Sequence, residues 1–409
     1  MIYRWDSTHA VAVMADGKVS ISSCSDDESV SWLDHQFPDG VTAQKVCVQL
    51  SMLVMLTSNN RVIVCLGPKN SFEDITADVY QILQGTLDIR NIDICADRTI
   101  VIITSNRVAI VEADVQRMEY IVTFKGRILC ETQCEIDMHT VDCHRGCVAV
   151  RTTNNCLYRV NKSGTIRGPG SSLSTWNIQL LEFHDGANVC EIVCNGYSMF
   201  LLMHNGTVYA QNFLGGELRC ETPRLFRQIT FPENETVIKI VVVCVGVFFI
   251  TAAGNCYYAS EHTCNMGGAI EIQLLSLCVD IVEDIYALRY GWAVQHSGGC
   301  VCILHTASLP NRNDGVKPYQ HVFEQYADGT AKPRLIPFFD DKSVVSIVRL
   351  FKRTYFITNK GHVYWFEDWT VDFDETTELT IARDPYFDAN PLAVKRGAQS
   401  IRSACSLLK

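Results

Sequence analysis

The segment CNGYSMFLLMHNGTVYAQNFLGGELR, residues 194–219, contains two apolar runs around a short polar break. The first run extends from Met199 to Met203, a His-Asn-Gly sequence interrupts it, and apolar residues resume at Val208 and Tyr209. Both runs are too short for helices and are rich in residues that suit a pleated sheet. Asn-Gly between such runs is a strong hairpin signal, because glycine readily adopts the positive φ of a tight turn. The segment predicts a β-hairpin.

The same pattern occurs eight times along the chain. The residues at the eight turns are Gly17, Asn60, Asn106, Asn155, Gly206, Gly254, Gly299 and Gly361. Successive turns lie 43 to 51 residues apart, except for the last interval, which is 62 residues. The third copy, around Asn106, has the shortest turn and fits the pattern least well.

A further apolar run precedes nearly every hairpin. These runs occupy residues 44–50, 90–96, 139–145, 189–195, 237–243, 279–285 and 343–349. Three or four strands every 45–50 residues, with no helical segment between them, are typical of β-propeller blades. One such small sheet cannot bury both of its faces, so blades must stack on one another. We therefore expect an all-β fold, with residues 1–409 forming a single propeller domain.

Individual motifs resemble the repeat of the regulator of chromosome condensation family, the RCC-type repeat. Residues 192–196 (IVCNG), Asn205-Gly206, Val208-Tyr209, and Asn212 followed by 215–218 (GGEL) follow the order of that repeat. Residues 360–365 (KGHVYW) and 16–19 (DGKV) are similar. Most copies lack the paired glycines and the Trp-Gly of the family, so the chain is identified as a divergent member. No Trp-Asp closes a hairpin, which argues against a WD-repeat propeller.

The resemblance implies seven blades, whereas the hairpins number eight. We expect eight, because the hairpins are the more direct observation, with seven as the alternative. We expect N- and C-terminal strands to close the propeller. In one form residues 400–408 (SIRSACSLL) pair with the first hairpin near His9, and in the alternative residues 1–5 (MIYRW) supply that strand.

Composition and charge exclude several functional classes of protein. The net charge is −10, and no run of Lys and Arg forms the basic stripe of a nucleic-acid binder. The start of the chain lacks the features of a secretion signal, and no apolar run has the length of a membrane span. The count of 19 cysteines is high, and most of them stand inside apolar runs, where they act as small hydrophobes. We expect an intracellular, cytoplasmic protein, with nuclear or cytoskeletal association as alternatives.

Three pairs of cysteines have C-x3-C spacing: Cys130/Cys134, Cys143/Cys147 and Cys190/Cys194. This spacing suits zinc, but residues i and i+4 of a strand also share one face, and the second interpretation is favoured. The sequence contains no motif of a nucleophile, metalloprotease or phosphate-binding loop. GPGSS at 168–172 is interpreted as a linker between blades. We therefore predict no enzyme activity, no catalytic residue, no metal site and no cofactor.

Two regions interrupt the repeat. Residues 305–340 form an insertion between the seventh and eighth units, and long loops on a rigid scaffold are often functional. Lys317, Tyr319, Tyr326 and Arg334 supply the cationic and aromatic side chains that interfaces favour, so they are the predicted partner-binding residues. A solvated loop is the alternative. The acidic stretch 366–378 could meet a basic partner or form a solvated connection.

The expected function is a non-enzymatic scaffold that binds proteins, as part of a larger assembly. The alternative comes from the resemblance, since some members of the family promote nucleotide exchange on the Ran GTPase. A guanine-nucleotide exchange factor or regulator of a small Ran-like GTPase needs no nucleophile, so the missing catalytic motifs do not exclude it. The expected partners are proteins, a small GTPase among them, and neither nucleic acid nor a membrane.

Overall fold

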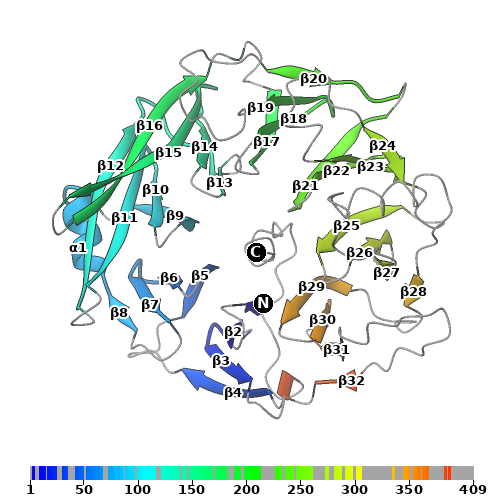
Figure 1. Cartoon of the computed structure of the whole chain (residues 1–409), viewed down its shortest axis with the longest axis horizontal. Coiled ribbons are helices and arrows are strands. Elements are labelled where there is room, and N and C mark those ends of the chain that lie inside the picture. The colour runs from blue at the N-terminus through cyan, green and yellow to red at the C-terminus, as the bar shows by residue number, and fades with distance from the viewer. Residues whose placement is uncertain are drawn as a thin grey trace. The chain divides into compact units, whose positions relative to one another are not determined.

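The computed structural model describes residues 2–4, 9–14, 16–24, 30–35, 42–49, 52–67, 72–86, 88–96, 99–116, 121–138, 141–144, 147–168, 171–181, 183, 188–194, 198–212, 226–232, 235–243, 246–260, 272–275, 281–287, 291–297, 301–305, 334–336, 344–350, 353–360, 362–367, 382–384 and 386–387. Their strands form eight four-stranded antiparallel sheets, accompanied by one α-helix. The chain divides into two compact units. The continuous unit is Phe37–Thr230, and the split unit combines Met1–Gln36 with Phe231–Lys409. Each unit contains four sheets (Figure 1).

In the continuous unit, strands follow one another in chain order within every sheet. The first sheet contains β5 (Ala43–Gln49), β6 (Met52–Thr57), β7 (Val62–Leu66) and β8 (Glu73–Asp74), and helix α1 (Thr76–Ile82) follows it. The second contains β9 (Ile89–Ala96), β10 (Thr99–Thr104), β11 (Arg107–Gln116) and β12 (Ile121–Glu131). The third contains β13 (Asp142–His144), β14 (Cys147–Arg151), β15 (Leu157–Gly168) and β16 (Ser171–Leu181). The fourth contains β17 (Val189–Cys194), β18 (Ser198–Met203), β19 (Val208–Asn212) and β20 (Arg227–Ile229).

The split unit repeats this order. Its sheets are β1 (Ile2–Arg4), β2 (His9–Val13), β3 (Val19–Cys24) and β4 (Val30–His35); β21 (Val237–Val243), β22 (Gly246–Thr251), β23 (Cys256–Ser260) and β24 (Gln273–Leu275); β25 (Val282–Ala287), β26 (Gly291–His296), β27 (Val301–His305) and β28 (Arg334–Ile336); and β29 (Val344–Leu350), β30 (Arg353–Thr358), β31 (Val363–Glu367) and β32 (Ala382–Arg383). All eight predicted hairpins and all seven predicted preceding strands are confirmed. The fold class is the all-β propeller expected from the sequence, and the described sheets number eight.

Strands that are buried on both faces explain the continuous apolar runs. Every residue of β6, β10, β18 and β22 is buried. A strand in the middle of a sheet that packs against sheets on both sides has no polar face, so its sequence does not alternate. In the continuous unit, each pair of neighbouring sheets shares a hydrophobic core. These cores lie between the first and second sheets, where α1 also contributes, between the second and third sheets, and between the third and fourth sheets.

Five of the described hairpin turns share one backbone hydrogen-bonding scheme, which residues 57–61 illustrate. The Thr57 amide donates to the Arg61 carbonyl at 3.0 Å, and the Asn60 amide donates to the Thr57 carbonyl at 2.9 Å. Asn60 has φ of 59°, as this turn requires. Positive φ also occurs at four other predicted turn residues: Gly17, Asn155, Gly206 and Gly254. Gly299 and Gly361 lie outside the described residues, and Asn106 stands in a two-residue turn between β10 and β11.

A buried threonine precedes several of these turns and was not recognised in the sequence. The residues are Thr57, Thr104, Thr152, Thr251 and Thr358. In Thr57 the hydroxyl oxygen accepts the Arg61 amide at 2.9 Å, and in Thr251 it accepts the Asn255 amide at 3.2 Å. The buried hydroxyl stabilises the turn by this hydrogen bond, and the β-branched side chain suits the strand that ends there. One residue type therefore meets both requirements.

A β-bulge recurs near the start of the first strand in six sheets. At each bulge, one residue of the first strand is left out of the register with the second strand. These residues are Gln44, Arg90, Cys190, Ile238, Glu283 and Val345. The bulge shifts the face alternation by one residue. Ile238 is consequently 54% exposed, although Val237 and Ile240 in the same run are buried.

The two ends of the split unit meet by packing. Ile2, Ala10 and Ala12 from the first sheet share a core with Tyr355 and Ile357 from the last. The Tyr386 hydroxyl also donates to the Ser20 hydroxyl at 2.9 Å. Because β1 and β3 occupy the two sides of β2, the strand beside the first hairpin comes from the start of the chain, as in the alternative form of closure. Residues 400–408 lie outside the described part of the chain.

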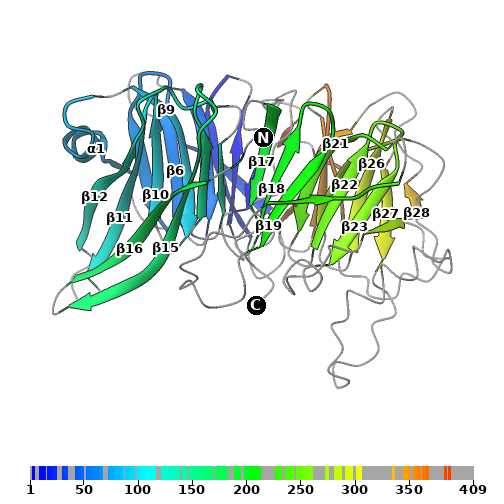
Figure 2. The ribbon, with the colours of Figure 1, turned by 90° about the horizontal axis from the view of Figure 1, so that it is seen from above.

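Two expectations were wrong in detail. Helix α1 stands between the first two sheets of the continuous unit, where no helical segment was expected. It packs against β12, where Gly126 allows the close approach: a Cβ there would lie 2.5 Å from Ile82 Cδ1 and 2.4 Å from the Ile110 carbonyl oxygen. The Gly-Pro-Gly segment after Arg167 does not link two sheets, because β15 and β16 on either side of it pair as one long hairpin (Figure 2).

Candidate docking face

The hairpin turns between second and third strands of the continuous unit form a candidate docking face. We call this surface the turn face; it consists of residues 58–61, 105–106, 153–156 and 204–207. The residues at the tips of three turns are exposed: 58–60, 153–155 and 204–205. These tips carry neutral polar side chains and one histidine, in the sequences SNN, TNN and HN.

The connection after β12 joins two of these turns. The Thr132 amide donates to the Asn106 carbonyl at 2.8 Å. A few residues later, the Asp137 amide donates to the Arg151 carbonyl at 2.8 Å, and the Thr153 amide donates to the Glu135 carbonyl at 2.7 Å. These backbone bonds hold the turns of the second and third sheets beside each other. A surface built this way keeps its shape without a partner, which reduces the entropy lost on binding.

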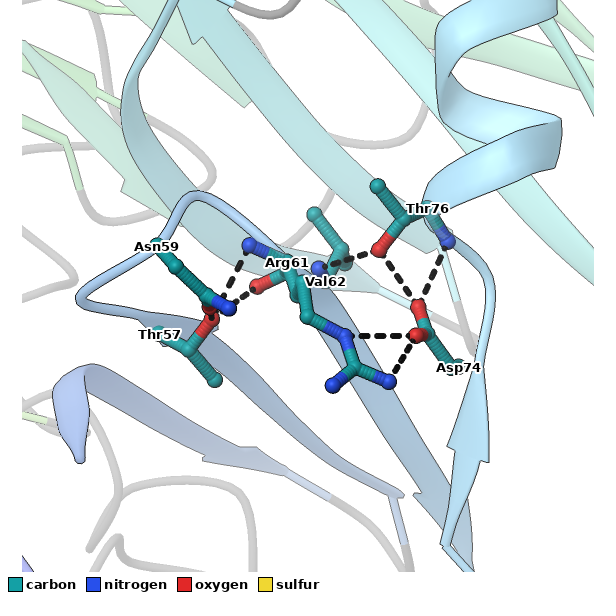
Figure 3. A network of polar contacts seen from close by, with 6 residues as sticks. All are labelled: Thr57, Asn59, Arg61, Val62, Asp74 and Thr76. Carbon is teal, nitrogen blue, oxygen red and sulfur yellow. Dashed lines mark hydrogen bonds and ion pairs between the residues drawn. The ribbon is translucent and has the colours of Figure 1, made fainter. Parts of the chain in front are cut away.

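Arg61 fastens the first turn to the outer strand of its sheet (Figure 3). Its Nε and Nη2 atoms contact Asp74 Oδ2 at 2.7 and 2.5 Å. The Asp74 carboxylate also accepts the Thr76 amide at 3.0 Å, at the start of α1. Burial raises the pKa of Asp74, but the hydrogen bonds from Thr76 and the ion pair with Arg61 outweigh it, so the pKa of Asp74 lies below its usual value.

Two more arginines at the base of the turn face are paired with carboxylates. Arg107 contacts Glu131 Oε1 through Nε at 3.0 Å and Nη2 at 2.9 Å, and its Nη1 donates to the Leu83 carbonyl at 3.0 Å. Arg151 forms an ion pair with Asp137. The cations described on this face are therefore neutralised within the protein. Such a surface suits hydrogen bonding with another protein better than binding to phosphate groups.

The asparagines at the tips are oriented by the threonines below them. The Thr57 hydroxyl donates to Asn59 Oδ1 at 2.6 Å, and the Thr152 hydroxyl bonds to Asn154 Oδ1 in the same way. Because the side-chain oxygen of each asparagine accepts the threonine hydroxyl, its Nδ2 group can donate hydrogen bonds to a partner. The sequence signal for this arrangement is Thr-x-Asn-Asn, which occurs at 57–60 and 152–155.

Contrary to the prediction from their spacing, Cys190 and Cys194 do not share one face of their strand. The bulge at Cys190 places Val189, not Cys190, in the core that contains Cys194, so these two cysteines do not share a face. The neighbour of Cys194 is Cys147 from the adjacent sheet. Among the described residues, no three His, Cys, Asp or Glu side chains gather closely enough to hold a metal ion. Burial raises the pKa of the Cys65 thiol to about 12 and also raises that of Cys130.

The predicted partner-binding residues lie almost entirely beyond the described structure. Lys317, Tyr319 and Tyr326 are outside the described residues. Arg334 begins β28, whose backbone pairs with β27 at Ile303. The predicted insertion at 305–340 therefore contributes the fourth strand of its sheet. Most of the acidic stretch 366–378 also lies outside the described residues.

Comparisons with known proteins give structural likenesses. No protein-family model and no curated protein matches the chain. Human WBSCR16 aligns with 67% of this chain and 75% of its own, at 14% identity and a TM-score of 0.43. Yeast RCC1 (Prp20), in its structure with Kap60, aligns over 77% and 79%, at 8% identity and a TM-score of 0.45. The computationally designed Ika8 protein aligns over 87% and 91%, at 10% identity and a TM-score of 0.49.

Two of these structures are RCC1-like propellers, but no family model confirms that the chain belongs to the RCC-type family. At these scores the likenesses carry no information about function. In the described part of the chain, no helix combines the length and apolarity needed to cross a membrane.

Proposed function

We propose that the protein is a non-enzymatic scaffold and that the turn face of the continuous unit binds a protein partner. The observation that carries this proposal is that hydrogen bonds from beneath the turn face hold its exposed turn tips in place. Thr57 and Thr152 hold the tips from below, and the connection 132–137 ties neighbouring turns together. Exposed polar groups on a rigid base suit recognition, because binding then orders few residues.

The partner that fits this surface is a folded protein or a polar peptide segment. The described cations Arg61, Arg107 and Arg151 are each paired with a carboxylate, so a polyanion gains little from contact with them. The insertion 305–340, with Lys317, Tyr319, Tyr326 and Arg334, remains a second proposed contact region. The proposal includes no catalytic step and no cofactor.

Affinity capture with cross-linking tests the proposal. A photoreactive residue is placed at Ser58, Thr153 or His204 in turn, all of which are exposed. The expected result is a stoichiometric protein cross-linked from at least one of these positions. Replacing all three by lysine should abolish capture, whereas Ala253→Lys should not, because Ala253 occupies the tip of a similar turn in the split unit.

Two results would overturn the proposal. One is recovery of no stoichiometric partner from any of the three positions. The other is accelerated release of fluorescent GDP from a small GTPase at catalytic amounts of the protein, which would make it an exchange factor. A partner captured solely through the insertion would overturn the turn face as the binding site, although the protein would still be a scaffold.

A further inference from the structure

Cys147 and Cys194 bring two thiols together from neighbouring sheets of the continuous unit. Cys147 lies on β14 and Cys194 on β17, and their Sγ atoms are 3.9 Å apart. Both lie in the core between the third and fourth sheets, where they are 3% and 2% exposed, and neither forms a disulfide. The residues are 47 positions apart in the chain, so the fold creates this contact.

Arg159 interacts electrostatically with both cysteines. Burial lowers the pKa of Arg159, whereas negative charge on Cys147 or Cys194 raises it. Two glutamines hold the guanidinium in place: Nη1 donates to Gln211 Oε1 at 3.0 Å, and Nη2 donates to Gln179 Oε1 at 2.7 Å.

The backbone of Cys194 is also fixed across the same sheet boundary. Its amide donates to the buried carboxylate of Asp142 on β13. The other inner-strand cysteines have different surroundings: the Cys95 thiol faces the Cys147 carbonyl at 3.6 Å, and the Cys47 thiol faces the Ile92 carbonyl at 3.3 Å. For Cys65 and Cys256, burial alone raises the thiol pKa, which keeps these groups protonated and unreactive.

We propose that Cys147 and Cys194 form a reversible disulfide on exposure to hydrogen peroxide and thereby link the third and fourth sheets covalently. The proposal does not depend on the docking function of the turn face. The two Sγ atoms must approach by about 1.9 Å to reach the bond length of about 2.05 Å. Side-chain rotation within the core supplies this movement more readily than a shift of the strands, because hydrogen bonds hold both backbones.

The chemistry balances without any other reactant. One thiolate attacks an oxygen of the peroxide, the O–O bond breaks, and hydroxide leaves to become water with the proton from that thiol. The product is a sulfenic acid. The second thiolate then attacks this sulfur, the S–O bond breaks, and the departing hydroxide takes the second thiol proton. Two thiols and one peroxide give one disulfide and two waters. A dithiol reductant reverses the reaction by thiol–disulfide exchange.

Peptide mapping of the full-length protein tests the proposal. The reduced protein is treated with hydrogen peroxide, remaining thiols are alkylated, and trypsin is added without reductant. Residues 146–151 form a tryptic peptide in which Cys147 is the single cysteine, and residues 168–219 form the peptide that contains Cys190 and Cys194. The expected product joins these two peptides. It should still form in Cys190→Ser, which is the matched control, and should be absent in Cys194→Ser.

Two further measurements separate a specific site from accidental oxidation. Arg159→Gln should slow formation of this disulfide several-fold, because the thiolates lose their nearby cation. Oxidation should raise the melting temperature of the wild-type protein by on the order of a few degrees, since the bond closes a long loop. Cys147→Ser should show no such rise.

The proposal is overturned if residues 146–151 remain alkylated while other cysteines oxidise. It is also overturned if Cys147 is joined mainly to a cysteine other than Cys194. Fragmentation of the linked peptides from the wild-type protein shows whether Cys190 or Cys194 carries the link, so the mapping stays decisive even when a serine variant folds poorly.

Discussion

Lys239 and Asp284 stand on the first strands of two neighbouring sheets and form an ion pair, with 2.7 Å between Nζ and Oδ2. Their side chains are 23% and 12% exposed. In the continuous unit, Lys45 occupies the equivalent place directly after the bulge and reaches Asn91 at 2.5 Å and Asp93 at 4.0 Å. Two of the described sheets therefore carry a lysine directly after the bulge that reaches across to the next sheet.

Removal of the Lys239 partner should destabilise the split unit. Asp284→Ala leaves a largely buried ammonium without its carboxylate, and we expect a loss of about 1.5–3 kcal/mol in the free energy of unfolding. Urea denaturation monitored by tryptophan fluorescence measures the change. The matched control is Asp16→Ala, which breaks the pair with Lys18 at 62% and 50% exposure and should cost under about 1 kcal/mol. Equal losses in the two variants would contradict the prediction.

The threonines below the turns give a second prediction. Thr57→Val keeps the shape of the side chain but removes the hydroxyl that accepts the Arg61 amide at 2.9 Å. We expect a loss of about 1–3 kcal/mol, because a partly buried amide loses a bond. Thr57→Ser, which retains the hydroxyl, should lose less. A serine variant as unstable as the valine variant would contradict the prediction, because packing of the methyl group would then contribute as much as the hydroxyl.

The contact between α1 and β12 depends on Gly126. In Gly126→Ala the new methyl group would lie 2.4 Å from the Ile110 carbonyl oxygen and 2.5 Å from Ile82 Cδ1. We expect a loss of about 1–3 kcal/mol, measured by urea denaturation, from the overpacking. Adding Ile82→Ala should restore part of this loss but not all of it, because the carbonyl contact remains. Full recovery would mean that the helix alone causes the strain.

Local patterns in the sequence predicted the hairpins well. The apolar runs around Asn60, Asn155 and Gly206 lie within single sheets, and each turn residue has the positive φ that its type favours. The continuous apolar run in β18 also follows from local structure, since both faces of that strand are buried. Such features depend on residues close together in the chain, where spacing alone carries the information.

Features created between sheets could not be predicted in this way. Lys45 and Asp93, or Cys147 and Cys194, are brought together by the packing of different repeats. The bulge at Cys190 changes which residues face the core, so the C-x3-C spacing wrongly placed Cys190 and Cys194 on one face of the strand. The turn face was not predicted for a similar reason. In the sequence its tips resemble ordinary loops, and only the hydrogen bonds of Thr57 and Thr132 in the structure show that the turns are held in place.

The carboxylate of Asp74 should make stability depend on pH below neutrality. Although burial raises its pKa, the bonds from Thr76 and Arg61 lower it below the usual 3.8. A carboxyl group with a lowered pKa in the folded state contributes stability that is present above 3.8 and is lost as pH falls through the folded-state pKa. Glu73, its neighbour, has the opposite shift, because burial and then the charge of Asp78 raise its pKa. Ionised Glu73 therefore contributes no stability at neutral pH.

Asp74→Asn and Glu73→Gln form a matched pair that tests this difference. At pH 7 we expect Asp74→Asn to be less stable than the wild type by about 0.5–1 kcal/mol, a value reduced by solvent screening of this partly exposed ion pair. The difference should shrink as pH falls below 3.8, where the wild-type carboxylate also takes up a proton. Glu73→Gln should be as stable as the wild type at pH 7, or slightly more stable. Urea denaturation at pH 7 and pH 3 measures both, and a gap for Asp74→Asn that persists unchanged at the lower pH would show that the amide disturbs the turn for reasons other than charge.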